Sequence, residues 1–391
     1  NVNKCKKFTN YKMKKYIFLI SAISALAISS CRKIETDGEK EVIVITQPGG
    51  NTQTAQTITV QGRINADTVL RKANTYILKG IVYLVGNHTM TIEAGTVIKG
   101  SFAGTDVAAL VITRGSKINA QGTATEPIVF TSASPNPQSG DWGGLVLCGK
   151  AEINTSFNGI AGLFQVEGGI DNAHGDGLAG SGDAVATVPV NDDNSGILSY
   201  VRIEYAGYAF QPDKEINSLT MACVGSGTQI DHIQVTYAKD DAYEWFGGTV
   251  NAKFLIAYKT QDDDFDTDNG FSGKIQFGLV LRDSLIADIS TSEAFESDNN
   301  SSGTTAQPKT SPIFSNITVL GPRATSNNIG NSLFRAGAQI RRNSSLSIFN
   351  SIISGWPQGI LIDAGTGSST ALNIEDSSLR IRNVTFAGNT I

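Results

Sequence analysis

Charged residues are scarce in this sequence, and beyond the lysines of the first 15 residues no basic patch appears. Asp, Glu, Lys and Arg make up 17% of the 391 residues, and the net charge is −5 at pH 7. A protein that binds nucleic acid needs a patch or stripe of Lys and Arg. Because the acids cluster here instead, the composition argues against a nucleic-acid partner and suits a cationic or metal-bridged ligand.

Helical patterning is missing as well. After residue 30, no stretch of helical length shows apolar residues recurring every 3.6 positions. Short apolar or β-branched runs occur instead, separated by turn-forming Gly, Asn and Asp, and the chain holds 41 glycines. Such runs predict an all-β fold, and their length favours a parallel β-helix over a sandwich. We place this domain at residues 57–391.

One short pattern occurs three times in the sequence. Its copies are the segments 243–248, 265–270 and 295–300, and each begins with an aromatic residue followed by an acid. A repeat of roughly 22 residues is typical of a coil that stacks on itself. Stacking would place Glu244, Asp266 and Glu296 in a column, about 4.8 Å apart per coil, with Asp268 and Asp298 beside it. Carboxylates this close repel unless a cation, a proton or a basic ligand lies between them.

The N-terminus has the pattern of a targeting segment. Met13 has the character of a translation start, and residues 16–28 form an apolar run as long as a signal-peptide core. The small residues before Cys31 resemble a bacterial lipobox, which implies cleavage there and a diacylglycerol on the sulfur. We expect residues 1–30 to be removed and residues 31–56 to tether a lipid-anchored protein to a membrane. The alternative is an ordinary secretory signal in which Cys31 occurs by chance.

Cysteine is rare within the expected domain. Two of the four cysteines, Cys148 and Cys223, lie there in apolar runs. Pairing would be possible in an oxidising compartment. However, roughly three coils of sequence separate them, and a disulfide joins Cα atoms only about 4.4–6.8 Å apart. We therefore expect each to be a small buried hydrophobic residue.

Two polar segments interrupt the repeat. Residues from about 153 to 195 are rich in Gly, Asp and Asn, and residues from about 299 to 312 form a second polar stretch. Insertions in a solenoid leave at the turns and often border a binding face. The last expected strands reach residue 391 without a polar cap sequence. We therefore expect a further coil, or a partner such as an outer-membrane protein, to cover that edge.

Four segments together resemble a known group of proteins. They are residues 140–147 (GDWGGLVL), 192–198 (DDNSGIL), 202–207 (RIEYAG) and 262–270 (DDDFDTDNG). In these segments the chain resembles Bacteroidetes outer-membrane lipoproteins with a right-handed parallel β-helix of the pectin-lyase-like type. The resemblance covers about residues 57–391. It implies this fold and a place in the cell envelope, periplasmic or surface-exposed, and it implies no settled activity.

Five carboxylates lie within seven residues, from Asp262 to Asp268. Alternate acids would face one side of an extended segment and offer the hard oxygen ligands that Ca²⁺ binds. An EF-hand does not fit, because the twelfth position from Asp264 is Ile275, where that loop needs a bidentate Glu. The alternative is a solvated turn whose acids cap backbone N–H groups. The expected Ca²⁺ ligands are Asp262, Asp264, Asp266 and Asp268.

Folds of the pectin-lyase-like type include lyases and hydrolases of acidic polysaccharides. A hydrolase needs carboxylates with different pKa values, whereas a Ca²⁺-dependent lyase needs an Arg or Lys base beside the metal. The Gly-His-Gly signature of polygalacturonases is missing, since none of the three histidines lies in such a motif. The candidate catalytic residues are Asp240, Asp241, Glu244, Asp263 and Arg282.

Aromatic residues surround the acids, and aromatic faces beside carboxylates suit sugar rings. We expect Tyr243, Phe265 and Phe295 to stack as a ladder inside the core. Trp245 should be exposed, because polar residues replace it in the other copies. The sequence thus favours an envelope lipoprotein that binds a polysaccharide with a bound cation, with a lyase or hydrolase of acidic glycans as the alternative. The expected binding residues are Trp245, Asp266, Asp268, Glu296 and Asp298.

Overall fold

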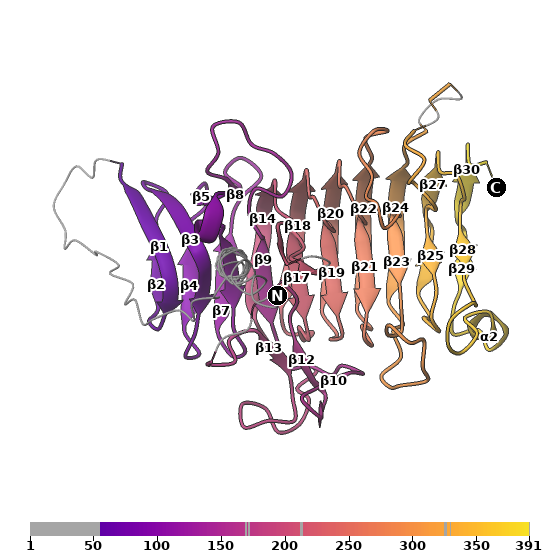
Figure 1. Cartoon of the computed structure of the whole chain (residues 1–391), viewed down its shortest axis with the longest axis horizontal. Coiled ribbons are helices and arrows are strands. Elements are labelled where there is room, and N and C mark those ends of the chain that lie inside the picture. Colours follow the sequence, from indigo (N-terminus) through magenta and orange to yellow (C-terminus); the bar gives the residue numbers. More distant parts are fainter. Residues whose placement is uncertain are drawn as a thin grey trace, which may run out of the picture. The chain divides into compact units, whose positions relative to one another are not determined.

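The computed structural model describes residues 55–390 apart from 169, 171–172, 212–213, 324–326 and 329. The expected leader, the lipidation residue Cys31 and most of the tether therefore lie outside the described residues. From residue 57 the chain winds into a right-handed parallel β-helix, as the sequence predicted. Figure 1 shows the coils stacked in chain order from β1 to β30.

Strand pairing divides the coils into three parallel faces. The first, here called the site face, contains the second halves of β1 (Thr57–Ile64) and β3 (Thr75–Leu84), then β6 (Ala109–Ile112), β9 (Leu145–Cys148), β17 (Leu219–Ala222), β19 (Tyr243–Phe246), β21 (Phe265–Asp268), β23 (Phe295–Ser297), β25 (Gln339–Ile340) and β28 (Leu361–Ile362).

The second and third faces share long strands that bend in the middle. The second face contains β2 (Thr68–Leu70), β4 (Thr89–Ile92), β7 (Lys117–Gln121), the first halves of β14 (Gly196–Glu204), β18 (Gln229–Thr236), β20 (Asn251–Tyr258), β22 (Lys274–Leu281) and β24 (Ile313–Leu320), then β26 (Ser347–Phe349) and β29 (Ile381–Arg382). The third face contains the first halves of β1 and β3, β5 (Val97–Gly100), β8 (Ile128–Ser132), the second halves of β14 to β24, then β27 (Ile352–Ser354) and β30 (Thr385–Ala387).

One residue with a left-handed backbone makes the bend in each of these later coils. A φ of about 60° in an L-residue costs about 1–2 kcal/mol relative to the right-handed form, and Asn tolerates it best after Gly. Backbone geometry therefore accounts for asparagine at this bend but not for large rings. With φ between 50° and 65°, the bend residues are Tyr200, His232, Phe254, Phe277, Asn316, Asn350 and Asn383.

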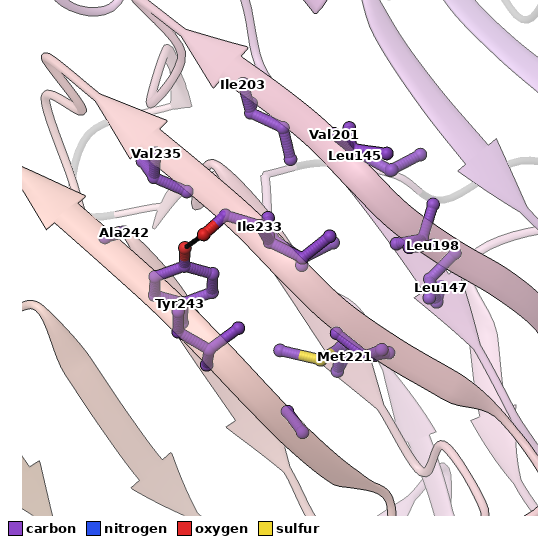
Figure 2. Packing of buried hydrophobic residues seen from close by; sticks show 14 of the residues in the cluster. Leu145, Leu147, Leu198, Val201, Ile203, Met221, Ile233, Val235, Ala242 and Tyr243 are labelled. Carbon is purple, nitrogen blue, oxygen red and sulfur yellow. Dashed lines mark hydrogen bonds between the residues drawn. The ribbon is translucent and has the colours of Figure 1, made fainter. Parts of the chain in front are cut away.

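Inward side chains stack in columns that fill the helix. On the site face one such column consists of Leu145, Leu219, Tyr243, Phe265 and Phe295, all fully buried. The ring centroids of Tyr243 and Phe265 are 5.6 Å apart, and those of Phe265 and Phe295 are 5.4 Å apart. This confirms the predicted internal ladder. Figure 2 shows the Tyr243 hydroxyl donating across the interior to the carbonyl oxygen of Ile233 at 2.9 Å.

Cys148 and Cys223 are free and fully buried, as predicted. The predicted three-coil separation is wrong, because Cys148 pairs in register with Ala222 and the two cysteines lie on adjacent coils. A single coil takes up the sequence between them because it carries the first insertion. Burial raises the pKa of the Cys148 thiol to about 12 and that of Cys223 well above its usual value. Both therefore stay protonated and inert.

Two insertions leave the coils where the sequence predicted them. The first contains the antiparallel pairs β10 (Ser156–Phe157) with β11 (Ile160–Ala161), and β12 (Leu163–Gln165) with β13 (Leu178–Gly180), and it projects beside β9 and β17 in Figure 1. The second precedes β24. The side-chain amide of Asn154 joins them, donating to the carbonyl oxygens of Asn299 at 2.8 Å and Pro308 at 2.9 Å.

The remaining elements are small. A short antiparallel pair, β15 (Ala209–Gln211) with β16 (Lys214–Glu215), follows β14. Helix in the described part of the chain is confined to the single turns η1 (Gly104–Asp106) and α2 (Leu372–Glu375). Neither turn has the length or the apolar character that a membrane span requires.

Candidate functional site

The outward side chains of the site face change character along the helix. Val146 of β9 is followed in register by Thr220, and then by Glu244, Asp266 and Glu296 on β19, β21 and β23. These three acids alternate along their strands with the buried aromatic ladder, so they point away from the core. The structure thus places the acids in the column that the sequence repeat predicted, here called the strand column.

A second column lies in the turns before the same strands, and we call it the turn column. Asn217, Asp241, Asp263 and Glu293 each stand two residues before the inward residue that opens the strand. The side chains of the first three each accept a hydrogen bond from the backbone N–H of the next member. The bonds measure 3.0 Å to Asn217, 2.8 Å to Asp241 and 2.6 Å to Asp263. This ladder of bonds fixes the turn carboxylates beside the strand column.

Carboxylates of the two columns meet in groups of three. Within each group the oxygens all lie within 4.8 Å of one another. Asp241 belongs to two groups and links them, whereas the third group shares no member with the others. Oxygens at this spacing can surround a hard cation. The groups are Asp241, Glu244 and Asp266; Asp263, Glu293 and Glu296; and Asp240, Asp241 and Asp262.

In the group of Asp241, Glu244 and Asp266, one buried carboxylate oxygen lacks a hydrogen-bond partner among the described residues. Asp241 is 7% exposed and Glu244 is 6% exposed, while Asp266 is half-buried. The side-chain amide of Asn217 donates to Glu244. The buried Oδ1 of Asp266 has no hydrogen-bond partner among the described residues. An ionised oxygen withdrawn from water without a partner is costly, so this position requires a cation or a proton.

Burial and mutual repulsion both favour the protonated forms of these acids. Burial, and then the charge of Asp266, raises the pKa of Glu244 well above its usual range. Burial, and then the charge of Glu296, does the same for Asp266. Burial, and then the charge of Asp298, raises the pKa of Asp268 to about 8. At neutral pH these acids therefore keep several protons unless positive charge replaces them.

Arginines neutralise the later end of the strand column. Arg341 places Nη2 2.7 Å from Glu296 and Nε 2.9 Å from Asp298, and Arg342 places Nη1 2.6 Å from Asp298. No ion pair reaches Glu244 or Asp266 within the described ranges. Glu244 and Asp266 therefore depend on a proton or a cation for neutralisation.

Comparison with protein-family models settles the family. The model described as a pectate-lyase-like beta helix domain matches residues 62–391. The chain belongs to the pectate-lyase-like β-helix family. No curated protein matches it in sequence. Membership supports a polysaccharide-related role, but a fold by itself does not select between binding and cleavage.

The pectate-lyase-like helix contains Trp245 in its core, so the prediction that Trp245 is an exposed binding residue is wrong. Trp245 lies between Met221 and Thr267 in an inward column and is fully buried. Its ring stacks on Phe271 with centroids 5.3 Å apart. Strand alternation forces this position, because Tyr243 and Trp245 are two residues apart and must face the same side.

Asp264 and Arg282 are also inside the helix. Their side chains are 0% exposed, and Arg282 Nε lies 3.0 Å from Asp264 Oδ2. The guanidinium carbon lies 5.5 Å from the ring centroids of both Phe334 and Trp356. A buried Arg in an ion pair cannot reach a substrate as a base, so the structure contradicts that suggested role for Arg282.

The four predicted Ca²⁺ ligands do not share one face. Asp264 is in the core, whereas Asp262 joins Asp240 and Asp241, and Asp266 joins Glu244. Asp268 follows Asp266 by two residues on β21 and lies near Asp298. The alternation of inward and outward side chains begins only at residue 265, where β21 starts. Residues 261–264 form a turn, in which this alternation does not apply.

Sequence reasoning missed three residues of the site. Glu293 and Asn217 belong to the turn column, and Arg341 neutralises Glu296. A signal for the first two existed in the sequence: each stands two residues before the inward residue of its strand, as Asp241 and Asp263 do. For Arg341 the sequence offered no equivalent repeat.

The first insertion covers the apolar part of the site face. Phe164 of β12 packs on Phe246, with ring centroids 4.8 Å apart. Val146, Cys148 and Phe246 form one buried cluster with Val166 and other insertion residues. The acids therefore begin where this cover ends.

Proposed function

We propose that the protein binds an acidic polysaccharide through a cation held by Asp241, Glu244 and Asp266. The observation that carries this proposal is the meeting of three carboxylates within 4.8 Å around the buried, unpartnered Oδ1 of Asp266. Ca²⁺ fits best, because it binds carboxylate oxygens and accepts irregular geometry. A bound Ca²⁺ with open coordination positions would in turn attract the carboxylates of an acidic glycan.

Cleavage at the same place is the rival function, and the geometry favours it less. Glycoside hydrolysis requires two carboxylates about 5–9.5 Å apart with substrate between them. The oxygens of Asp241, Glu244 and Asp266 instead lie within 4.8 Å of one another. Elimination requires an accessible base, and Arg282 is buried while Arg341 binds two carboxylates. Binding without cleavage is therefore the conclusion we favour.

The same proposal places the protein at the cell envelope, with a lipid on Cys31 holding it to a membrane. This part rests on the lipobox-like segment alone, since Cys31 lies outside the described residues. The polar tether would let the acidic columns meet a polysaccharide beyond the membrane surface.

Calcium titration of the full chain tests the proposal. Isothermal titration should detect one or more Ca²⁺ sites, and binding to polygalacturonate should require Ca²⁺ and stop in EDTA. Asp266→Asn should weaken both, because it removes charge at the unpartnered oxygen. Asp192→Asn removes an exposed acid outside the columns and serves as the matched control. Absence of heat with Ca²⁺, or glycan binding that EDTA leaves unchanged, would sink the proposal.

A further inference from the structure

A groove lies outside the site face, along the bend between the second and third faces. Its volume is about 540 Å³, within the range of small-molecule sites. Part of its floor consists of the outward residues Ile256 and Leu279 of the third face. One wall consists of the bend residues Tyr200, His232, Phe254 and Phe277.

The rings of this wall form a continuous stack along the helix. Successive centroids are 4.2 Å apart for Tyr200 and His232, 4.5 Å for His232 and Phe254, and 5.1 Å for Phe254 and Phe277. Phe254 is 42% exposed and Phe277 is 40% exposed. The stack therefore presents an apolar strip to solvent, with one ring for every coil.

The fold does not require rings at these positions. Asn316, Asn350 and Asn383 occupy the same bend in the following coils, and Asn adopts this backbone conformation at little cost. Phe254 and Phe277 adopt it at φ 58° and 65°, against their steric preference. Strained residues of this kind occur most often where a site needs their side chains. A contact made by the rings would account for them.

The polar groups of the groove indicate what it would accept. Its two lining residues with basic side chains both have acidic partners. Arg202 pairs with Glu204, and His232 Nδ1 lies 2.7 Å from Asp231. The other polar lining groups on the described strands, such as Gln234, are neutral. An acidic ligand would find no free counter-charge here. A neutral sugar matches the groove, because its apolar C–H groups can pack on Ile256, Leu279 and the ring wall while its hydroxyls bond to amides such as that of Gln234.

We propose that this aromatic groove binds a neutral, unbranched polysaccharide strand running along the helix axis. The ring repeated once per coil, about every 4.8 Å, suits a polymer whose own units repeat regularly. The groove and the acidic columns lie on different faces, so the two ligands would bind independently. No cation is needed for this second ligand.

Binding of neutral hexasaccharides to the full chain in EDTA tests this inference. The probes are cellohexaose, xylohexaose, mannohexaose and laminarihexaose, with hexagalacturonate as the charged comparison. We expect one neutral probe to bind and hexagalacturonate not to bind without Ca²⁺. The double variant Phe254→Asn/Phe277→Asn installs the residue of the neighbouring coils at both bends. It should keep its thermal midpoint and lose about tenfold or more in affinity.

Tyr237→Asn is the matched control. Tyr237 stacks on Tyr205 with centroids 5.4 Å apart and meets Tyr258 edge-to-face at 6.0 Å. It also has a left-handed backbone at φ 56°. It lies outside the groove lining, so its replacement should leave affinity unchanged. Asp266→Asn should also leave it unchanged, which separates this inference from the calcium proposal.

Three results would overturn the inference. One is failure of all four neutral hexasaccharides to bind the wild-type chain. Another is equal affinity of the wild type and the Phe254→Asn/Phe277→Asn variant. The third is a self-association or detergent-micelle interaction that the double variant abolishes while no sugar binds, which would assign the strip to an apolar partner.

Discussion

Without calcium, the protein should lose stability as the pH rises from 5 to 8. Unfolded Asp and Glu titrate near pH 4. In the folded protein, burial raises the pKa of Asp268 to about 8, and burial that outweighs the attraction of Arg341 raises that of Glu296 to about 8. Between about pH 4 and pH 8 the folded state therefore holds protons that the unfolded state has released. Their stabilising effect is complete below pH 4 and is lost as the pH approaches 8.

The slope of this loss follows from the number of such protons. Each proton held only by the folded state lowers the free energy of unfolding by about 1.4 kcal/mol for every pH unit. Asp268 and Glu296 together would give about 2.7 kcal/mol per unit, a large share of a domain stability of about 5–15 kcal/mol. Calcium that binds the ionised acids should flatten the slope, because it replaces the protons.

Urea unfolding at a series of pH values measures this slope. All three tryptophans, Trp142, Trp245 and Trp356, are fully buried, so their fluorescence should report the transition. The series is run once with EDTA and once with excess Ca²⁺. Asp268→Asn should reduce the metal-free slope by about 1.4 kcal/mol per pH unit. A metal-free stability that stays constant or rises between pH 5 and 8 would refute the reasoning.

The remaining predictions concern the core and the anchor. Arg282→Met leaves Asp264 buried without its partner and should lower the free energy of unfolding by about 3–5 kcal/mol in urea titrations, whereas adding Asp264→Leu should recover part of that loss. Phe265→Ala removes the middle ring of the internal ladder and should cost about 3–5 kcal/mol in the same assay. Cys31→Ser should abolish incorporation of labelled palmitate in cells and release the protein from the membrane fraction; labelling that persists would contradict the lipobox interpretation.

The sequence was sufficient to predict the stacking register because one pattern recurs along it. Parallel coils place equivalent residues above one another, so repeated aromatic and acidic positions become columns. This is why the internal ladder and the strand column of Glu244, Asp266 and Glu296 agree with the structure. The short strands and missing helical periodicity predicted the fold class for the same reason.

The wrong predictions have separate physical causes. Trp245 was expected outside because polar residues replace it in later copies, yet strand parity fixes its side regardless of residue type. Asp264 lies in a turn, where alternation does not apply. The spacing of Cys148 and Cys223 was misjudged because an insertion lengthens one coil without adding another. Glu293 escaped prediction because acid pairs, Asp240-Asp241 and Asp262-Asp263, precede the first two copies, whereas Ser292-Glu293 precedes the third.

The two proposed surfaces follow from one property of a solenoid. A side chain repeated at one position of each coil becomes a line on the surface, so the residue type at that position sets the chemistry of a whole face. On the site face the outward position is Val146 under the first insertion, then Thr220, and it is acidic from Glu244 onward. On the opposite bend the position is aromatic at Phe254 and Phe277 and becomes Asn at Asn316. Both changes occur while the coils keep the same parallel pairing, which means that ligand chemistry varies along this helix while the fold remains constant. Substitutions along the aromatic bend should therefore change binding far more than they change stability, whereas substitutions of the buried acids should change both.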